Sequence, residues 1–480
     1  MKTINIVTQG HAFVKDYRDI LVQFFPTSKI FINKEYEGRG TLIIALDKNV
    51  IDIRFKGEEI KDYRYTSQLQ SQGDEVRQIK KHMVLALTEV TQKNLPWGIL
   101  TGIRPVKIPH KLIIQGNTCK EVEEYLKKEY FLSTEKASLI TDLAQVEIST
   151  MYPIKPYDTM LYIGIPFCPS RCYYCSFISQ VSVGYEDLVS DYFIALLKET
   201  EAILAFLKER KVRIRCIYIG GGTPTVLDSR QIEKLFSLLY KYIPWNQLKE
   251  VNFEAGRPET IHKDNLMVLK NYGVHRICIN TQTLKNDTLK RIGRKHTAQD
   301  FYRAMEVAQG MGFDTINTDL ILGLEGENVK DIQNNIQKII QLKPENITIH
   351  NLSLKKSSIL HQEDKFLYQS NELICKMNEK VKEALKQNQY SPYYLYRQKY
   401  AQGNLENAGY ALKGKEGFYN IGIMSEKISI IGLGAGSSGK LFYPEEDRLE
   451  RLETVKNSKV YINNVEQICL KKISLMRKLW

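Results

Sequence analysis

The stretch GIPFCPSRCYYCSFIS, residues 164–179, contains three of the eight cysteines of this chain within eight positions. Cys168, Cys172 and Cys175 have the spacing C-x3-C-x2-C. The β-rich run LYIGIP, residues 161–166, leads directly into them, so we expect the cysteines on a loop at the carboxyl end of a strand. Because ligands bind at that edge of the sheet in parallel α/β folds, this loop is the first candidate for a functional site.

Five further β-rich runs follow, and amphipathic helical patterns separate them. The expected strands after the first are IRCIYIG (214–220), EVNFEA (250–255), RICINT (276–281), TINTDLIL (315–322) and NITIHNL (346–352). Strands that alternate with helices in this way predict βα units and a parallel sheet. We therefore expect an α/β fold with a partial (βα)6 TIM-like barrel, although a doubly wound sheet fits the same pattern.

The chain of 480 residues is too long for one ordinary core, and its pattern of elements changes twice. We expect residues 1–150 to form an α+β accessory domain, residues 155–370 the barrel, and residues 371–480 a C-terminal accessory region that covers the substrate. In the first region, TLIIALDKNVIDIRFKG predicts two strands, and DEVRQIKKHMVLALTEVTQ, CKEVEEYLKKEY and STEKASLITDLAQV predict helices. The segments at 95–112 and 152–160 are expected to be connectors.

Charge and hydropathy limit the classes of partner. The formal net charge of +13 allows a substrate with several carboxylates, but the basic residues form no long run, so nucleic acid is not expected. The sequence has no apolar run long enough for a membrane span and no signal-peptide pattern, so we expect a soluble cytoplasmic protein. Thiols are normally reduced there, which favours a metal over a disulfide for clustered cysteines. The scattered cysteines are expected to be small buried residues: Cys119, Cys216, Cys278, Cys375 and Cys469.

The cysteine spacing favours an iron–sulfur cluster. Three thiolates on one loop can bind three irons of a [4Fe–4S] cluster and leave the fourth iron open. A zinc site would need four ligands, and the sequence shows no paired Cys or His at a matching spacing. Cys168, Cys172 and Cys175 are therefore the candidate metal ligands.

Small and polar residues follow the second and third expected strands. The motif YIGGGTPT, residues 218–225, includes Gly221, Gly222 and Thr223, and its glycines let backbone N–H groups approach an anionic ligand closely. Glu254 ends the third strand, where a carboxylate can bind ribose hydroxyls.

Three more candidates lie on the fourth and fifth strands and in the loop between them. Gln282 and Asp319 can bind hydroxyls and amines, and Arg294 can form a two-pronged contact with a carboxylate. Each of the three alone is also explained by a structural role.

The motifs LYIGIPFCPSRCYYCSF, GGGTPT, LKRIGRKHT and DLILGLEGE, in this order, resemble the radical S-adenosylmethionine (SAM) superfamily. Within it they resemble the oxygen-independent coproporphyrinogen III oxidase-like (HemN-like) family. The motifs LPWGILTGIRPVKI, YYLYRQKYAQGNLENAGYA and GLGAGSSGK are similar to its HemZ branch of coproporphyrinogen dehydrogenases. The resemblance implies a [4Fe–4S] cluster whose open iron binds the amino and carboxylate groups of SAM, and whose reduction cleaves SAM to methionine and a 5′-deoxyadenosyl radical.

The resemblance also implies one or two SAM molecules and their contacts. Tyr162, Gly221 and Glu254 would contact the SAM on the cluster. The contacts of a second SAM would be Tyr174, Gly222, Thr223, Gln282, Arg294 and Asp319. No side chain is singled out as catalytic.

The activity that the resemblance implies belongs to haem biosynthesis. It is the oxygen-independent oxidative decarboxylation of two propionates of coproporphyrinogen III to vinyl groups, which gives protoporphyrinogen IX. A basic pocket would suit this tetrapyrrole, and a low-potential electron donor of the flavodoxin or ferredoxin type would reduce the cluster.

One position departs from the oxidase pattern. The oxidases have C-x3-C-x2-C-x-C, whereas Phe177 occupies the place of the fourth cysteine, as in the haem-chaperone branch. Two alternatives therefore stay open. The chain could be a haem-trafficking protein, with His350 or His361 as an axial ligand, although each is also explained as a core or solvated histidine. It could also act on another tetrapyrrole, such as haem.

Overall fold

The computed structural model describes residues 3–26, 28–33, 40–57, 60–69, 74–177, 180–353, 358–359, 369–398 and 402–480. It divides into two compact units. The first is Met1–Val146 with Arg397–Tyr400, and the second is Glu147–Tyr396 with Ala401–Trp480.

The first unit is built on a five-stranded sheet in the order β2-β1-β3-β4-β5. Its strands are β1 (Thr3–Gln9), β2 (Lys29–Ile32), β3 (Gly40–Asp47), β4 (Val50–Gly57) and β5 (Ile60–Gln68). Helices α1 (Lys15–Phe24) and α2 (Glu75–Thr91) pack on each other. Ile51 and Ile53 point to one side of β4 with the period of two of a strand, and they share a core with Met83 and Leu87 of α2, which have helical spacing. The two strands and the helix expected here are β3, β4 and α2.

Three helices follow in the chain, and the last of them crosses the boundary between the two units. They are α3 (Lys107–Ile114), α4 (Cys119–Tyr130) and α5 (Thr134–Met151). The segment 95–112 is therefore not a connector throughout, because α3 begins within it. α4 begins at a capping box in which Thr118 and Glu121 bond each other's backbone N–H groups, which satisfies two otherwise unpaired donors.

The second unit contains an eleven-stranded sheet in the order β14-β15-β13-β12-β11-β10-β9-β6-β16-β17-β18. Its six central strands are mutually parallel, which confirms the predicted α/β barrel-like fold. They are β6 (Asp158–Ile165), β9 (Arg213–Gly221), β10 (Glu250–Gly256), β11 (Arg276–Ile279), β12 (Thr315–Leu322) and β13 (Asn346–Asn351). β6 begins within the segment 152–160, so the last three residues of that expected connector belong to the sheet.

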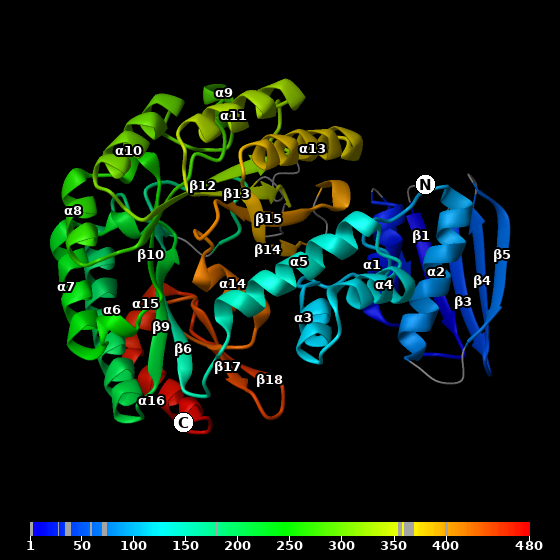
Figure 1. The fold of residues 1–480 in the computed structure, drawn as a ribbon, viewed down its shortest axis with the longest axis horizontal. Helices are drawn as coiled ribbons and strands as arrows, with labels where there is room; N and C mark the ends of the chain where they lie inside the picture. The colour runs from blue at the N-terminus through cyan, green and yellow to red at the C-terminus, as the bar shows by residue number, and fades with distance from the viewer. Residues whose placement is uncertain are drawn as a thin grey trace. The chain divides into compact units, whose positions relative to one another are not determined.

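Helices cover the outer side of this curved sheet (Figure 1). They are α6 (Glu186–Glu209), α7 (Ser229–Tyr242), α8 (Lys263–Asn271), α10 (Ala298–Gly310) and α11 (Val329–Gln341), as their periodicity predicts. A short helix that the pattern did not indicate, α9 (Asn286–Arg291), lies between β11 and α10.

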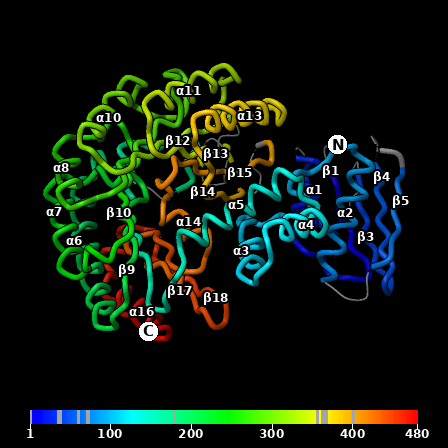
Figure 2. Tube along the Cα trace, in the orientation of Figure 1, coloured from blue at the N-terminus to red at the C-terminus, as the bar shows by residue number. Residues whose placement is uncertain are grey.

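The C-terminal part of the chain adds strands to both edges of the same sheet. β15 (Glu406–Ala411) pairs antiparallel with β13, next to β14 (Ser391–Arg397), and β16 (Ser429–Leu433) pairs parallel with β6. β17 (Ser438–Tyr443) and β18 (Arg448–Glu453) extend the second edge. The helices of this part are α13 (Asn371–Gln387), α14 (Phe418–Ser425), α15 (Ser458–Asn463) and α16 (Val465–Met476). Figure 2 follows the chain to its end, where α15 and α16 pack on α6.

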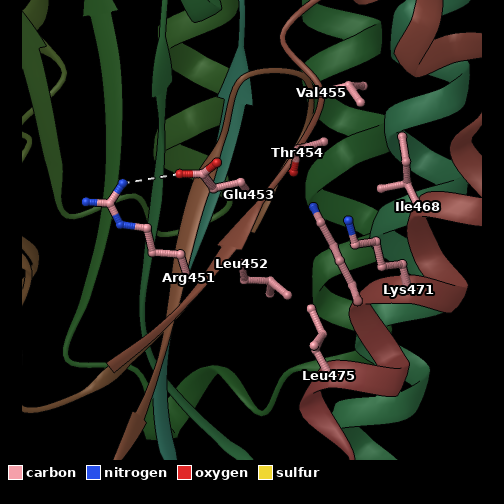
Figure 3. Close-up of a pocket in the computed structure, with 9 residues that line it drawn as sticks. Arg451, Leu452, Glu453, Thr454, Val455, Ile468, Lys471 and Leu475 are labelled. Atoms are coloured by element: carbon pink, nitrogen blue, oxygen red, sulfur yellow. Dashed lines mark hydrogen bonds and ion pairs between the residues drawn. The ribbon is translucent and has the colours of Figure 1, made fainter. Parts of the chain in front are cut away.

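A cavity of about 350 Å³ lies between β18 and α16 (Figure 3). Leu452 of β18 and Thr454, which follows the strand, line it on one side, and Ile468 and Lys471 of α16 line it on the other. None of the predicted cluster or SAM residues lines this cavity. Within the described ranges, no helix combines the length and apolar character needed to cross a bilayer.

Candidate functional site

The loop that carries Cys168, Cys172 and Cys175, here called the cysteine loop, leaves the carboxyl end of β6 and folds back on itself. The two-residue strands β7 (Phe167–Cys168) and β8 (Gln180–Val181) pair with each other, and the Cys175 N–H donates to the Cys172 carbonyl at 3.1 Å. Cys172 is buried, and the other two cysteines are partly exposed. The loop therefore holds the three thiols at the edge of the sheet where the sequence predicted them.

The loop is not shaped around a single ion. Among the described residues, no group of three or more His, Cys, Asp or Glu side chains is gathered closely enough to hold a metal ion. A single zinc ion draws cysteine sulfurs to about 2.3 Å, whereas the cysteines of a cluster bind different irons and stand farther apart. The assignment of Cys168, Cys172 and Cys175 as cluster ligands stays a prediction.

The glycine turn after β9 packs directly on this loop. Gly221 has a φ of 116°, and a Cβ on it would lie 3.0 Å from the Ile165 carbonyl oxygen. A Cβ on Gly222 would overlap the Phe167 carbonyl. The N–H of Gly222 donates to the Ile165 carbonyl at 2.8 Å, and the N–H of Thr223 donates to the Phe167 carbonyl at 2.7 Å. The amides expected to face an anionic ligand are thus bonded within the protein, and the glycines allow close packing of two strand ends.

Glu254 lies at the end of β10 beside a stack of tyrosines. Its carboxylate accepts hydrogen bonds from the Tyr218 hydroxyl and, at 3.1 Å, from the Gly221 N–H. The Tyr218 ring stacks on Tyr419 of α14 with 4.2 Å between ring centroids, and on Tyr162 with 6.0 Å. Tyr218 stands in the quoted glycine motif but was not singled out, and Tyr419 comes from a distant part of the chain without a local signal.

Burial raises the pKa of Glu254 to about 7, and the charge of Asp319 adds to the rise. The hydrogen bonds from Tyr218 and Gly221 act in the opposite direction but do not cancel it. Near neutral pH this carboxyl group can therefore hold or release a proton in response to a ligand.

The contribution of Glu254 to the stability of the protein should fall as the pH rises from about 4.5 to about 7, because Glu254 loses its proton at a lower pH in the unfolded chain than in the folded one. The measurement is the urea unfolding free energy of the wild type minus that of Glu254→Gln at each pH. We expect this difference to fall by on the order of 2 kcal/mol across the window. The subtraction matters because the pKa of Glu327 is also raised to about 7, and that group is common to both proteins. A pH-independent difference would contradict the expectation.

Arg294 is buried between the cysteine loop and the end of β11. Its guanidinium donates to the Tyr174 hydroxyl at 3.4 Å and to the Asn280 carbonyl at 3.2 Å. Three buried polar atoms here find no hydrogen-bond partner among the described residues: Nε of Arg294, Oδ1 of Asn280 and Oε1 of Gln282. Since unpaired buried polar atoms are costly, this set fits a polar ligand beside the cysteine loop.

Asp319 on β12 belongs to a second polar cluster. It accepts a hydrogen bond from Asn317 at 2.9 Å and lies 3.4 Å from Nε2 of His350, whose Nδ1 is 3.2 Å from the Tyr396 hydroxyl. Burial raises the pKa of Asp319, but the contacts with His350, Asn317 and Thr348 outweigh it, and the net shift is downward. The Asp319 carbonyl accepts from the Gln282 N–H at 2.9 Å, and the Ile321 N–H donates to the Gln282 carbonyl at 2.9 Å, so backbone hydrogen bonds link β12 to the residues around Arg294. His350 thus has protein partners, and His361 lies outside the described residues.

Comparison with known proteins identifies the family. Residues 162–339 match the Radical SAM superfamily. The chain is 35% identical, over 88% of its length and 87% of the relative's, to the oxygen-independent coproporphyrinogen-III oxidase-like protein HemZ of Bacillus subtilis. The chain belongs to the HemN-like family of the radical SAM superfamily. This membership implies a [4Fe–4S] cluster and SAM, and the three thiols and the unpaired polar atoms near Arg294 fit those groups.

The names of other similar proteins describe different functions. The heme chaperone HemW of Lactococcus lactis is 30% identical over 58% of this chain and 69% of its own length. Among solved structures, coproporphyrinogen III oxidase (HemN) from Escherichia coli matches with a TM-score of 0.53 at 20% identity, covering 68% of this chain and 72% of that one. At that identity the match supports the fold, and it confirms the expected architecture.

Proposed function

We propose that this chain is an oxygen-independent coproporphyrinogen III dehydrogenase, a radical SAM oxidoreductase of haem biosynthesis. The observation that carries the proposal is the meeting of the cysteine loop with buried Arg294, whose Nε is unpaired, at one edge of the sheet. A guanidinium in that place can bind a carboxylate, and the proposed substrate has four propionates. The similarity to the HemZ-like protein along most of the chain supports this choice of substrate.

The chain's own residues would bind and orient the substrate and exclude water. When bound to the reduced cluster, SAM supplies a 5′-deoxyadenosyl radical that can remove a hydrogen atom. Each vinyl group then requires the loss of one β-hydrogen atom, one CO2 and one further electron, which an iron–sulfur or flavin carrier would take up. Tyr162, Tyr218 and Tyr419 would form an apolar wall near Glu254, where bulk water is kept from the reacting carbon.

The direct test is an anaerobic incubation of the reconstituted protein with SAM, a low-potential reductant and coproporphyrinogen III. Mass spectrometry should show 5′-deoxyadenosine and the loss of two CO2 per porphyrinogen. If 5′-deoxyadenosine forms while coproporphyrinogen III is unchanged, the substrate is wrong but the radical SAM assignment stands; incubation with haem then tests the other tetrapyrrole.

A haem-trafficking role is the second candidate, and Phe177 favours it. This residue stands where the oxidases have a fourth cysteine, and it is 73% exposed. The similarity to the heme chaperone HemW points the same way. Titration with haem, followed by the Soret absorbance, separates the two candidates: stoichiometric binding without decarboxylation would favour the chaperone.

Arg294→Lys should uncouple SAM cleavage from product formation. Lysine keeps the positive charge but loses the planar fork that can hold a carboxylate, whether from a second SAM or from a substrate propionate. We expect normal iron content, continued 5′-deoxyadenosine formation, and product formation roughly 10- to 100-fold lower. Asp319→Asn should show the same uncoupling of SAM cleavage from product formation if Asp319 and Arg294 bind the same ligand.

The matched control for this test is Arg291→Lys. Arg291 is an exposed residue of α9 that donates to the Glu325 carbonyl, so its replacement should leave the ratio of 5′-deoxyadenosine to vinyl product unchanged. A wild-type ratio and wild-type turnover in Arg294→Lys would show that Arg294 has only a structural role.

A further inference from the structure

A buried arginine that follows β10 binds the cysteine loop. Arg257 follows β10, and its side chain is 5% exposed. One terminal nitrogen, Nη2, donates to the Ser170 carbonyl at 2.6 Å and to the Cys172 sulfur at 3.1 Å. The other, Nη1, donates to the Ser170 hydroxyl at 3.1 Å. A single guanidinium thus binds the carbonyl and the hydroxyl of Ser170, which lies between Cys168 and Cys172, and also the sulfur of Cys172.

The charge of this arginine is balanced within the protein. Nη1 of Arg257 lies 3.3 Å from the Glu259 carboxylate, which in turn lies 3.2 Å from Nδ1 of His296. Burial acts to raise the pKa of Glu259, but His296 and Arg257 outweigh it and hold that pKa at about 2. Because a buried cation needs a fixed partner, this carboxylate holds the Arg257 guanidinium in place without help from a ligand.

We propose that Arg257 is a positioning residue for the iron–sulfur cluster. It holds the cysteine loop in its binding conformation before the cluster arrives, and it raises the cluster's reduction potential once Cys172 is a ligand. The inference rests on the cluster that the proposed function requires. Its physical reason is that a positive N–H group beside a ligating sulfur favours the more negative, reduced cluster.

The fork of the arginine is needed for both parts of this role. Only a planar guanidinium can reach the Ser170 backbone and the Cys172 sulfur together while a second nitrogen faces Glu259. Arg257→Lys keeps the buried charge opposite Glu259 but loses some of these bonds. Arg257→Gln removes the charge as well.

The experiment uses the full chain, reconstituted anaerobically, and measures the reduced cluster by electron paramagnetic resonance at a series of fixed potentials. In Arg257→Gln we expect the ratio of reduced to oxidised cluster at a given potential to fall about tenfold, which is about 59 mV for a one-electron couple. Arg257→Lys should show a smaller shift in the same direction. In the iron-free proteins, amide hydrogen exchange over residues 168–177 should be faster in both variants than in the wild type.

The matched control is Arg213→Gln. Arg213 also pairs with a buried carboxylate, that of Asp158 at 2.5 Å, but it lies at the start of β9, at the opposite end from the cysteine loop. Neither the potential nor the exchange of residues 168–177 should change in this variant. If Arg213→Gln changed the reduction potential as much as Arg257→Gln does, the proposal would be overturned, because the change would then follow from the loss of any paired arginine.

The remaining outcomes are also decisive. Wild-type potential and wild-type exchange in both Arg257 variants would show that this arginine only fills space, and would overturn the inference while leaving the proposed function intact. A wild-type protein that takes up no iron would instead remove the proposed function itself. If Arg257→Gln does not fold, Arg257→Lys decides the question by the same two measurements.

Discussion

Alanine in place of Cys168, Cys172 or Cys175 is expected to abolish SAM cleavage. Each thiolate would hold a different iron of the cluster, so a three-cysteine site has no spare ligand. Anaerobically purified wild type should carry about four irons and four sulfides per chain. In each single variant the iron content should fall sharply, and 5′-deoxyadenosine should fall to the level of a reaction without protein.

The control for this loss is Cys375→Ala. The sequence predicted a buried Cys375, but it is an exposed cysteine of α13, away from the cysteine loop in the sequence, so its replacement tests the general effect of removing a thiol. This variant should keep the iron content and activity of the wild type. A triple variant without Cys168, Cys172 and Cys175 that still bound iron and formed 5′-deoxyadenosine would disprove the cluster assignment.

The sequence could predict the central sheet because its signals are local. Each of the six parallel strands is a short apolar run bounded by a turn, and the helices between them have a clear apolar period. For the C-terminal strands, no local signal indicates the partner strand. β16 is the five-residue run SIIGL, and its partner β6 is 270 residues earlier, where Thr159 lies opposite Ser429. Pairing at such a separation leaves no trace in a local pattern.

The candidate site was predictable to the same extent. The cysteines, the glycine turn and Glu254 end neighbouring strands, so their approach follows from the order of the sheet. The hydrogen bonds of the glycine amides did not follow, because they depend on how closely the cysteine loop packs against β9. Arg257 also follows a strand at this edge, but nothing in its type or spacing distinguishes it from an ordinary surface arginine.

Loss of one partner from the buried pair Glu199–Lys472 should destabilise the protein by about 3–5 kcal/mol. Both side chains are almost fully buried, and their charged atoms are 2.5 Å apart. The Glu199 carboxylate also accepts from the Tyr461 hydroxyl at 2.6 Å and from the Gly434 N–H at 2.7 Å. Lys472→Met leaves that carboxylate without its counter-charge, and urea unfolding followed by circular dichroism measures the cost.

Two further variants make this a sharp test. Glu201 lies on the same helix, α6, and pairs with Lys241 in an exposed position, so Glu201→Ala should cost much less stability than Lys472→Met. The double variant Glu199→Gln with Lys472→Met removes both charges, and it should recover part of the stability that Lys472→Met loses. Equal costs for Lys472→Met and Glu201→Ala would contradict the expectation.

The position of this pair connects stability to the candidate site. The Tyr192 hydroxyl, which accepts from the Ala435 N–H at 3.0 Å, donates to the Gly164 carbonyl at 2.6 Å, and Gly164 opens the stretch that carries the cysteines. The turn at Gly434 that Glu199 holds is therefore tied to the strand end from which the cysteine loop departs. Lys472→Met should consequently lower the retention of iron on dilution, whereas Glu201→Ala should not. Full iron retention in Lys472→Met despite lost stability would show that the cysteine loop keeps its shape independently of the C-terminal helix.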